Sequence, residues 1–169
     1  TNDIAIGLRT SVTQAEDLKV AHGAALTTSV DASEMIEVPG PGGRAVKEIS
    51  RNVLASIIEP RMEEIFSLVA RDLRQAVSLD RLASGIVVTG GGASLAGVTD
   101  LAEQMFDVPV RLGELKGFAH VPDNLSAPSY AAGFGLLMYG FANEPTATHR
   151  SGRMRSLLSR LEDWITRKM

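Results

Sequence analysis

The sequence has no cysteine, few aromatic residues and no long apolar run, and each shortage excludes a class of protein. Without cysteine, the 169-residue chain can form neither a disulfide nor a cysteine-ligated zinc site. Its three histidines are scattered without ligand spacing, so we expect no metal site. No apolar run approaches the roughly 20 residues of a membrane-spanning helix, and the first residues lack the pattern of a signal peptide. Aromatic residues make up only 5%, so the core should be aliphatic.

Charge is unevenly distributed along the chain. The whole sequence carries −3, but residues 150–169 hold six basic and two acidic side chains, a net +4 that leaves −7 on residues 1–149. The acidic body is a poor candidate for binding nucleic acid. A basic end on an acidic body suggests that this end has an anionic partner of its own.

Helix and strand signals alternate in the first fifty residues. Thr13–Glu16 fits a capping box, in which the Thr13 and Glu16 side chains each satisfy a backbone amide. The helix that it opens should end at Gly23, in the left-handed conformation that glycine favours. Residues 35–38 and 44–47 flank a Pro/Gly cluster and predict a β-hairpin.

A long helix should follow the hairpin, capped by Ser50. Ile49 and Leu54 are placed to form a hydrophobic staple around this cap. Pro60 should kink or divide the helix, because proline cannot donate to the carbonyl four residues earlier. The helix should bury one face, formed by apolar residues at steps of three and four: Val53, Ile57, Ile58, Met62, Ile65, Phe66, Val69, Leu73 and Val77.

The clearest local pattern lies between residues 85 and 112. Ile86–Thr89 is a continuous apolar strand of the kind buried on both faces. A turn of Gly90, Gly91 and Gly92 follows, then an amphipathic helix and a second strand at 108–112. Strand, glycine turn, helix and strand form a βαβ unit, so the fold class is α/β.

An apolar helix with small residues is predicted at 129–139. Its Gly133 and Gly135 would let it approach a neighbour closely, although each glycine lowers helix propensity by about 1 kcal/mol. The chain has no starting methionine and opens directly into an apolar pattern, so we expect a fragment of a longer protein.

The glycine turn is the first candidate binding site. Three glycines at the end of a strand let a ligand lie against bare backbone, and amides at a helix N-terminus attract polar or anionic groups. A tight turn without a ligand is the alternative. The spacing is not G-x-G-x-x-G and no Walker lysine follows, so neither a dinucleotide fingerprint nor a P-loop is present.

Residues 85–97 closely resemble the adenosine motif of the actin, Hsp70 and sugar-kinase superfamily, whose double glycine packs under adenine and ribose. Residues 15–19 resemble the segment whose Glu and Lys approach the same nucleoside from the other side. A capping Glu16 and a solvent-exposed Lys19 are the structural alternatives. The resemblance implies that the adenosine of ATP is bound by Gly90, Gly91, Gly92, Glu16 and Lys19.

Further stretches resemble FtsA, a bacterial actin-like cell division family, in family order: 1–5, 38–39 with 42–44, 58–61 and 129–137. Ile58–Arg61 is distinctive because helices seldom keep an internal proline. The resemblance implies an actin-like fold with subdomain 2B at 1–84, the returning part of 2A at 85–141, a flexible linker at 142–152 and a membrane-targeting helix at 153–169. The phosphate loop, the Mg²⁺-binding acidic residues and subdomain 1C would lie upstream, so this segment alone should bind ATP poorly and not hydrolyse it.

Residues 153–169 form a second candidate site. Their apolar side chains fall on one helical stripe: Met154, Leu157, Leu158, Leu161, Trp164 and Ile165. Basic residues flank that stripe, namely Arg153, Arg155, Arg160, Arg167 and Lys168. Trp and Leu between basic residues suit an anionic membrane interface, and this segment resembles the FtsA membrane-targeting sequence. A partner-binding helix, or one that folds back on the body, is the alternative.

A third candidate is the basic cluster of Arg44, Lys47, Arg51 and Arg61, which could equally be a solvated surface. In FtsA, subdomain 2B receives the acidic and apolar C-terminal peptide of FtsZ, and Lys47 and Arg61 match its basic positions. A lysine at position 47 could not pair with a carboxylate in the bidentate manner of arginine.

The resemblance thus implies an adaptor at the septum, on the cytoplasmic face of the inner membrane, that anchors the FtsZ ring and self-associates into actin-like filaments. ATP with Mg²⁺ would bind in the intact protein, with at most weak hydrolysis. A PilM-like pilus assembly protein, or an ATPase or sugar kinase of the actin–Hsp70 superfamily, is the alternative.

Overall fold

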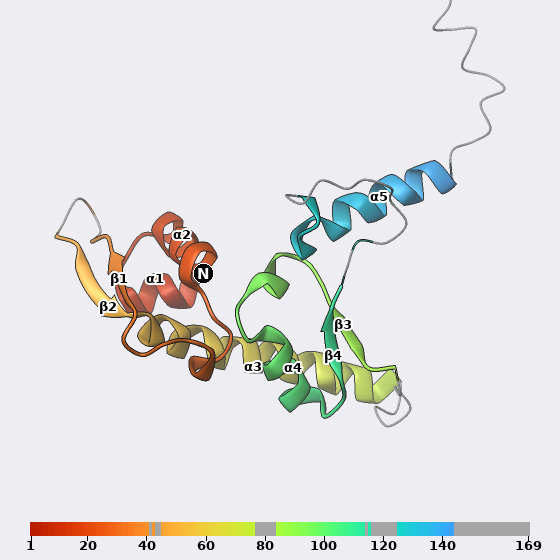
Figure 1. Cartoon of the computed structure of the whole chain (residues 1–169), viewed down its shortest axis with the longest axis horizontal. Helices are drawn as coiled ribbons and strands as arrows, with labels where there is room; N and C mark the ends of the chain where they lie inside the picture. The colour runs from red at the N-terminus through yellow and green to blue at the C-terminus, as the bar shows by residue number, and fades with distance from the viewer. Residues whose placement is uncertain (41, 43–44, 77–83, 114, 116–124, 144–169) are drawn as a thin grey trace, which may run out of the picture. The chain divides into compact units, whose positions relative to one another are not determined.

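A computed structural model describes residues 1–40, 42, 45–76, 84–113, 115 and 125–143 (Figure 1). The chain divides into two compact units, Thr1–Ala132 and Gly133–Met169. Each unit is described by itself.

The first half of the larger unit packs two short helices and a hairpin on one long helix. Helices α1 (Asn2–Leu8) and α2 (Val12–His22) precede strands β1 (Met35–Val38) and β2 (Lys47–Ser50), and α3 (Arg51–Ala76) follows directly. The strands pair antiparallel. A first core lies between these elements, formed by Ile4, Ala15, Leu18, Ile36, Val38, Leu54 and Ile58.

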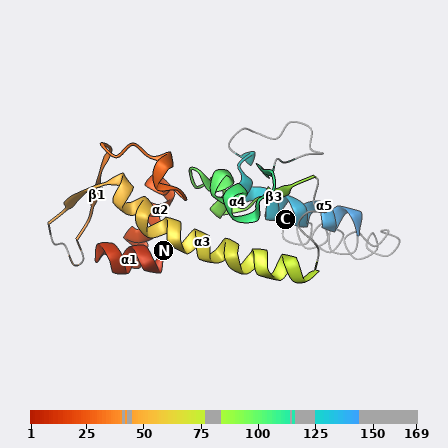
Figure 2. The ribbon, with the colours of Figure 1, turned by 90° about the horizontal axis from the view of Figure 1, so that it is seen from below.

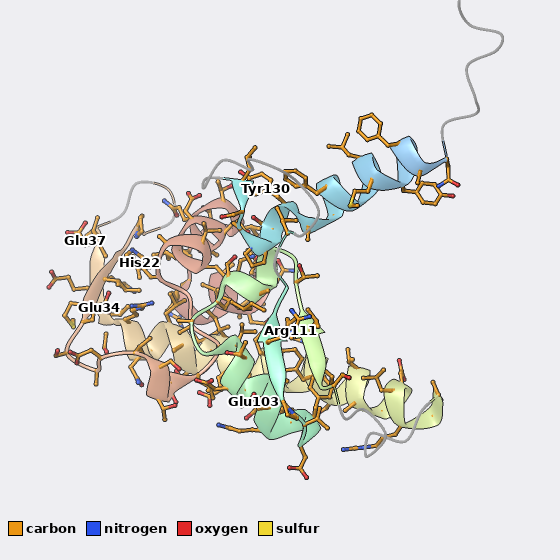
Figure 3. The ribbon with its side chains drawn as sticks, turned by 45° about the vertical axis from the view of Figure 1, so that its right-hand side comes forward. His22, Glu34, Glu37, Glu103, Arg111 and Tyr130 are labelled. Atoms are coloured by element: carbon orange, nitrogen blue, oxygen red, sulfur yellow. The ribbon has the colours of Figure 1, made fainter. Side chains whose placement is uncertain are left out.

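The second half is the predicted βαβ unit. Strands β3 (Ile86–Val88) and β4 (Val110–Leu112) pair in parallel, and α4 (Val98–Phe106) connects them. The Glu103 carboxylate accepts from the Val110 amide at 2.9 Å and ties α4 to β4 (Figure 3). A second core forms here, comprising Ala25, Leu26, Phe66, Ala70, Val98, Leu101, Ala102 and Phe106.

Helix α3 runs along both halves of the larger unit (Figure 2). It contributes Leu54 and Ile58 to the first core and Phe66 and Ala70 to the second. Between them, Met62 packs against both cores, as does Leu95 from the turn before α4. The loop after α2 is a second connection, because the Ala25 amide donates to the Ala96 carbonyl at 2.8 Å. The short 3₁₀ turn η1 (Thr27–Ser29) follows on this loop.

The first helix cap differs from the prediction. The capping box is formed by Ser11 and Gln14, not by Thr13 and Glu16. The Ser11 hydroxyl accepts from the Gln14 amide at 3.2 Å, so α2 begins two residues earlier than expected and the Glu16 carboxylate takes no part in the cap.

Gly23 does end α2, but in an extended conformation with φ −61° and not in the left-handed one. Glycine is needed at position 23 for packing and not for its backbone conformation. A Cβ at this position would come within 2.7 Å of Leu95 Cδ2 and would clash with the Lys19 carbonyl. Gly23 is therefore suited to close packing between α2 and the turn before α4.

The second hairpin strand lies at Lys47–Ser50, three residues beyond the predicted 44–47. The observed register pairs Ile36 with Ile49, and both contribute to the first core, whereas Val46 stays exposed. Burial of Ile49 thus decides the register. It also places Ile49 beside the core that contains Leu54, as the predicted staple requires.

Helix α3 begins as predicted, with the Asn52 amide donating to the Ser50 hydroxyl at 3.3 Å. It runs through Pro60 as one helix, so the predicted division is wrong, and the predicted kink stays a prediction. The predicted apolar face is wrong in part. Small residues, Ala55 and Ala70, complete the buried stripe, while Val53, Ile65 and Val69 are each over 40% exposed.

Strand β3 is not buried on both faces in the described chain. Ile86 and Val88 pack on the second core, whereas Val87 is 47% exposed. The described sheet has only two strands here, and α3 and α4 pack against one side of it. The glycine turn also differs, since Gly91–Ser94 forms the 3₁₀ turn η4 and α4 begins only at Val98.

The last described helix, α5 (Ala131–Ala142), follows the 3₁₀ turn η6 (Pro128–Tyr130) and confirms the predicted apolar helix with slightly later bounds. Within its own unit, a Cβ added at Gly133 or Gly135 would meet no described atom within 4 Å, so the close approach expected at these glycines stays a prediction.

Candidate functional site

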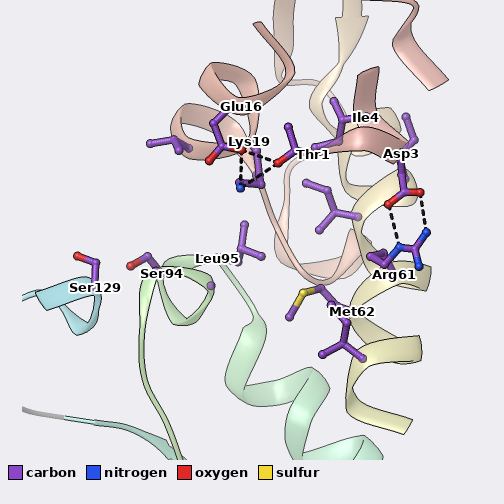
Figure 4. Close-up of a pocket in the computed structure, with 17 residues that line it drawn as sticks. Thr1, Asp3, Ile4, Glu16, Lys19, Arg61, Met62, Ser94, Leu95 and Ser129 are labelled. Carbon is purple, nitrogen blue, oxygen red and sulfur yellow. Dashed lines mark hydrogen bonds and ion pairs between the residues drawn. The ribbon is translucent and has the colours of Figure 1, made fainter. Parts of the chain in front are cut away.

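A pocket of about 520 Å³ opens in the larger unit between the first three helices and the glycine turn (Figure 4). Its floor is apolar, and its rim carries two groups of charged side chains. The apolar lining comes from α1, α2, α3 and the turn before α4: Ile4, Val20, Ile57, Ile58, Met62, Ile65 and Leu95. The volume lies within the range of about 300–1,000 Å³ that small-molecule sites occupy.

Glu16 and Lys19 form the first charged group. Lys19 Nζ donates to Glu16 Oε2 at 2.7 Å and to the Thr1 hydroxyl at 3.2 Å, and that hydroxyl donates to the same carboxylate (Figure 4). The pair is one helical turn apart on α2, which places both side chains on one face. The Lys19 ammonium, and after it the Thr1 hydroxyl, lowers the pKa of Glu16 below its ordinary value. Glu16 is therefore a carboxylate at neutral pH.

The glycine turn supplies a backbone wall to the same pocket. Gly91 and Gly92 line it, and a Cβ added at either would meet no atom within 4 Å. The backbone at these positions is consequently open to a ligand. Gly90 does not line the pocket. Its φ of +92° and the hydrogen bond that its amide donates to the Pro128 carbonyl, at 3.0 Å, shape the turn behind that wall.

Arg61 forms the second charged group, with two carboxylates. Its Nε donates to Asp3 Oδ2 at 2.8 Å and a terminal nitrogen to Asp3 Oδ1 at 2.7 Å, while the other terminal nitrogen pairs with Glu64. The guanidinium lowers the pKa of Asp3, and the Asp3 carboxylate in turn raises the pKa of Arg61 further above its already high value. The bidentate pair joins α1 to α3 at the rim (Figure 4).

Comparison with known proteins identifies the family of this chain. The family model "Cell division protein FtsA" matches residues 1–135. The chain belongs to the FtsA family. Among curated relatives it is similar to "Cell division protein FtsA" of Pseudomonas aeruginosa, with 38% identity over 98% of this chain and 42% of the relative. The FtsA proteins of Neisseria meningitidis and Escherichia coli K12 are each 35% identical, over 98% and 99% of this chain and 42% and 43% of theirs.

The chain thus spans about two-fifths of the length of the curated FtsA relatives it matches. The family match favours FtsA over the pilus-assembly and kinase alternatives. The match to the family model ends at residue 135, so the predicted amphipathic segment at 153–169 lies beyond it. The alignments to the relatives, in contrast, cover nearly the whole chain.

The four basic residues predicted to bind FtsZ do not form one described cluster. Arg44 lies outside the described residues. Lys47 is exposed at the start of β2, and Arg51 bonds the His22 carbonyl and Glu34, at 2.8 Å each (His22 and Glu34 are labelled in Figure 3). Arg61 lies ten residues along α3 from Arg51, which is about 15 Å at the helical rise of 1.5 Å per residue. Its side chain turns to Asp3 of α1.

The predicted membrane-targeting helix at 153–169 lies wholly outside the described residues, and so do residues 144–152 of the predicted linker. Within the part of the chain that the structure describes, no helix is long and apolar enough to cross a membrane. That part also contains no group of three or more His, Cys, Asp or Glu side chains that could hold a metal ion.

The structure brings together four of the five residues predicted to flank adenosine: Gly91, Gly92, Glu16 and Lys19. Sequence reasoning missed that Thr1, Asp3 and Arg61 line the same pocket. For Thr1 and Asp3 the sequence gives no signal, because their partners are at least 15 residues away and lie on different helices.

Proposed function

We propose that this FtsA-family chain contributes the adenosine side of an ATP site to an actin-like cell division adaptor. One observation carries the proposal: a single pocket unites the bare backbone of Gly91 and Gly92 with Glu16 and Lys19, which come from a distant part of the sequence. The resemblance of residues 85–97 and 15–19 to two superfamily motifs predicts that these segments meet at one nucleoside. A Glu16 that only caps its helix and a Lys19 that is only solvated would not have to lie beside the glycine turn.

The chemistry of the pocket suits a nucleoside. Its apolar floor can take the faces of a purine, and the open backbone at Gly91 and Gly92 leaves room for a flat ring. Glu16 can accept hydrogen bonds from ribose hydroxyls, and Lys19 can donate to a base or a sugar. For Mg²⁺ and the phosphates we propose ligands beyond the described residues.

Gly91→Val in the full-length protein tests this assignment. The new side chain would extend into open pocket space, so we expect loss of ATP binding with little change in thermal stability. Titration with a fluorescent ATP analogue measures the affinity. Ser67→Val is the control, because it places the same side chain at an exposed position of α3, in the same unit, that does not line the pocket. Unchanged ATP affinity in Gly91→Val would show that adenosine does not bind here.

We propose further that Arg61 anchors the acidic C-terminal peptide of FtsZ. Support comes from its exposure, with 49% of the side chain accessible, and from the exposed Ile65 one turn along α3. Arg61 would supply the charge and Ile65 an apolar contact. Lys47 and Arg51 lie elsewhere on the surface and would at most steer the peptide electrostatically.

Arg61→Glu should weaken binding of an FtsZ C-terminal peptide by about ten-fold, because reversing one partner of a rim charge pair costs less than the roughly 2–5 kcal/mol of a buried one. Calorimetry at low salt measures the affinity. Arg71→Glu, an equal charge reversal on the exposed part of α3, serves as the control. Unchanged affinity in Arg61→Glu would remove Arg61 from the site.

Residues 153–169 complete the proposed adaptor as an amphipathic anchor on the inner membrane. The support is the sequence itself, with six apolar residues on one stripe and basic residues around it. Held at the septum in this way, the intact protein would link FtsZ to the membrane and self-associate into filaments.

A further inference from the structure

We propose that Asp3 is an internal competitor for Arg61, which an acidic peptide must displace to bind the Nε fork of the guanidinium. The inference rests on the proposed role of Arg61 as the anchor of such a peptide. It adds a residue that sets the affinity of that site and that lies on a different helix from the anchor.

The geometry of the pair shows why the two ligands would compete. Asp3 uses both carboxylate oxygens and occupies the side of the guanidinium formed by Nε and one terminal nitrogen, at 2.8 and 2.7 Å. This fork is the arrangement in which arginine recognises a carboxylate most strongly. Glu64 accepts from the other terminal nitrogen, so three of the five guanidinium N–H donors have a partner within the chain. A peptide carboxylate can reach the same fork only if Asp3 leaves it.

Asp3 is held at this position by the fold. It lies in the first turn of α1, and the next residue, Ile4, is 1% exposed in the first core. Because the helix is anchored in the core, the Asp3 carboxylate faces Arg61 at a high effective concentration. Asp3 is therefore a persistent competitor, whereas a carboxylate on a free chain end would compete only weakly.

The pair is nevertheless accessible and reversible. The side chains of Arg61 and Asp3 are 49% and 36% exposed, and ion pairs exposed to this degree are weak. Water can solvate the Asp3 carboxylate once Arg61 turns away. The peptide would meet apolar surface beside the arginine, because Ile65 lies one turn further along α3 and is exposed. An acidic and apolar peptide fits this surface better than a purely acidic one.

Asp3→Asn in the full-length protein tests the inference. Asparagine keeps the size of the side chain and removes the charge that competes for Arg61. We expect a fluorescein-labelled FtsZ C-terminal peptide to bind about five-fold more tightly by anisotropy. Should Asp3→Asn fold poorly by circular dichroism, Asp3→Ser removes the same charge and should give the same gain.

Two further variants separate the possible failures. Glu63→Gln removes an equal charge from the exposed part of α3 without touching Arg61, and it should leave affinity unchanged. Asp3→Asn should give no gain when combined with Arg61→Ala. If Arg61→Ala weakens binding but Asp3→Asn does not tighten it, Asp3 is not a competitor and the inference is overturned. If Arg61→Ala changes nothing, the anchor assignment fails, and the inference fails with it.

Discussion

Two glycines in the same βαβ unit show how single residues divide between folding and binding. Gly97 has φ +73°, and a Cβ there would approach Ser29 Cβ at 3.0 Å and Leu26 Cβ at 3.2 Å. Gly91 has ordinary backbone angles and nothing within 4 Å. The fold thus requires glycine at position 97, whereas at position 91 glycine only keeps the pocket open. Substitution at Gly91 consequently reports on ligand binding with little interference from stability.

The Asp3–Arg61 pair should give stability a specific pH dependence. Arg61 lowers the pKa of Asp3 from its ordinary 3.8, so the folded pKa is the lower one. A carboxylate of this kind stabilises the fold above its unfolded pKa, and its contribution is lost as pH falls through the folded pKa. We expect Asp3→Asn to lower the free energy of unfolding by a constant amount between pH 7 and about 5.

Below pH 3.8 the difference between Asp3→Asn and the parent should shrink as Asp3 takes up its proton. Urea unfolding of both proteins at a series of pH values measures it. Glu63→Gln, which touches neither residue, should show no such pattern. A difference that appears only between pH 5 and 7 would point to another titrating group.

The residue scale also shows the limit of sequence reasoning. Glu16 and Lys19 could be found because residues 15–19 resemble, as one local segment, the part of the actin, Hsp70 and sugar-kinase superfamily that approaches the nucleoside. The structural alternative for Glu16 proved wrong, since Ser11 and Gln14 form the cap. The bond between Asp3 and Arg61 spans 58 residues and depends on how α1 crosses α3. No periodicity in either segment carries that information.

At the scale of elements, periodicity predicted which segments form helices and strands but not their bounds. The βαβ unit was predictable because an apolar run, a glycine turn and a helical stripe adjoin one another. The register of β2 was not, because Val46 and Ile49 are both plausible inward residues, and only contact with the first core favours Ile49. Alanines 55 and 70 on α3 were overlooked for a similar reason, since small residues are buried where neighbours approach closely.

Pro60 is an unfavourable residue that α3 retains. The helix continues from Arg51 to Ala76 through it, although proline removes one backbone hydrogen bond. Proline costs about 3 kcal/mol relative to alanine inside a helix, and its restriction of the unfolded chain offsets up to about 1 kcal/mol. We expect Pro60→Ala to raise the free energy of unfolding by roughly 1–2 kcal/mol.

Urea unfolding followed by circular dichroism measures this change. Ser67→Ala, at an exposed position later in α3, should change stability by only about 0.5 kcal/mol. A loss of stability in Pro60→Ala would mean that the proline shapes α3 between the two cores. In that case peptide and ATP affinities of the variant should be measured next, since Arg61 and Met62 follow directly.

At the scale of the whole molecule, α3 and the pocket connect the two cores. Met62 and Leu95 pack against both, and the pocket is lined from both halves of the larger unit. A ligand in the pocket would contact α1, α2, α3 and the glycine turn together. Thr1, the cap of α1, bonds to Glu16, and Asp3, in the first turn of α1, bonds to Arg61. Both charged groups are therefore joined to the same end of α1.

The end of the chain has a different physical character from this body. Residues 150–169 carry +4 against −7 on the rest, and the linker before the apolar stripe has no helical periodicity. A short amphipathic helix gains most of its stability from burial of its apolar face. We therefore expect residues 153–169 to need an apolar surface to pack on, and an anionic lipid surface would offer one together with charge complementarity.

A peptide of residues 151–169 should accordingly become helical on anionic liposomes and sediment with them. Raising salt should weaken binding without abolishing it, because screening acts on the arginines and not on Leu157, Leu158, Leu161 and Trp164. Trp164→Glu places a charge in the apolar stripe and should release the peptide at any salt. Thr166→Glu is the matched control, because it adds the same charge about 200° further around the helix and should retain much of the binding. A parent peptide that stays in the supernatant and gains no helix would exclude the membrane role and favour a protein partner for this segment.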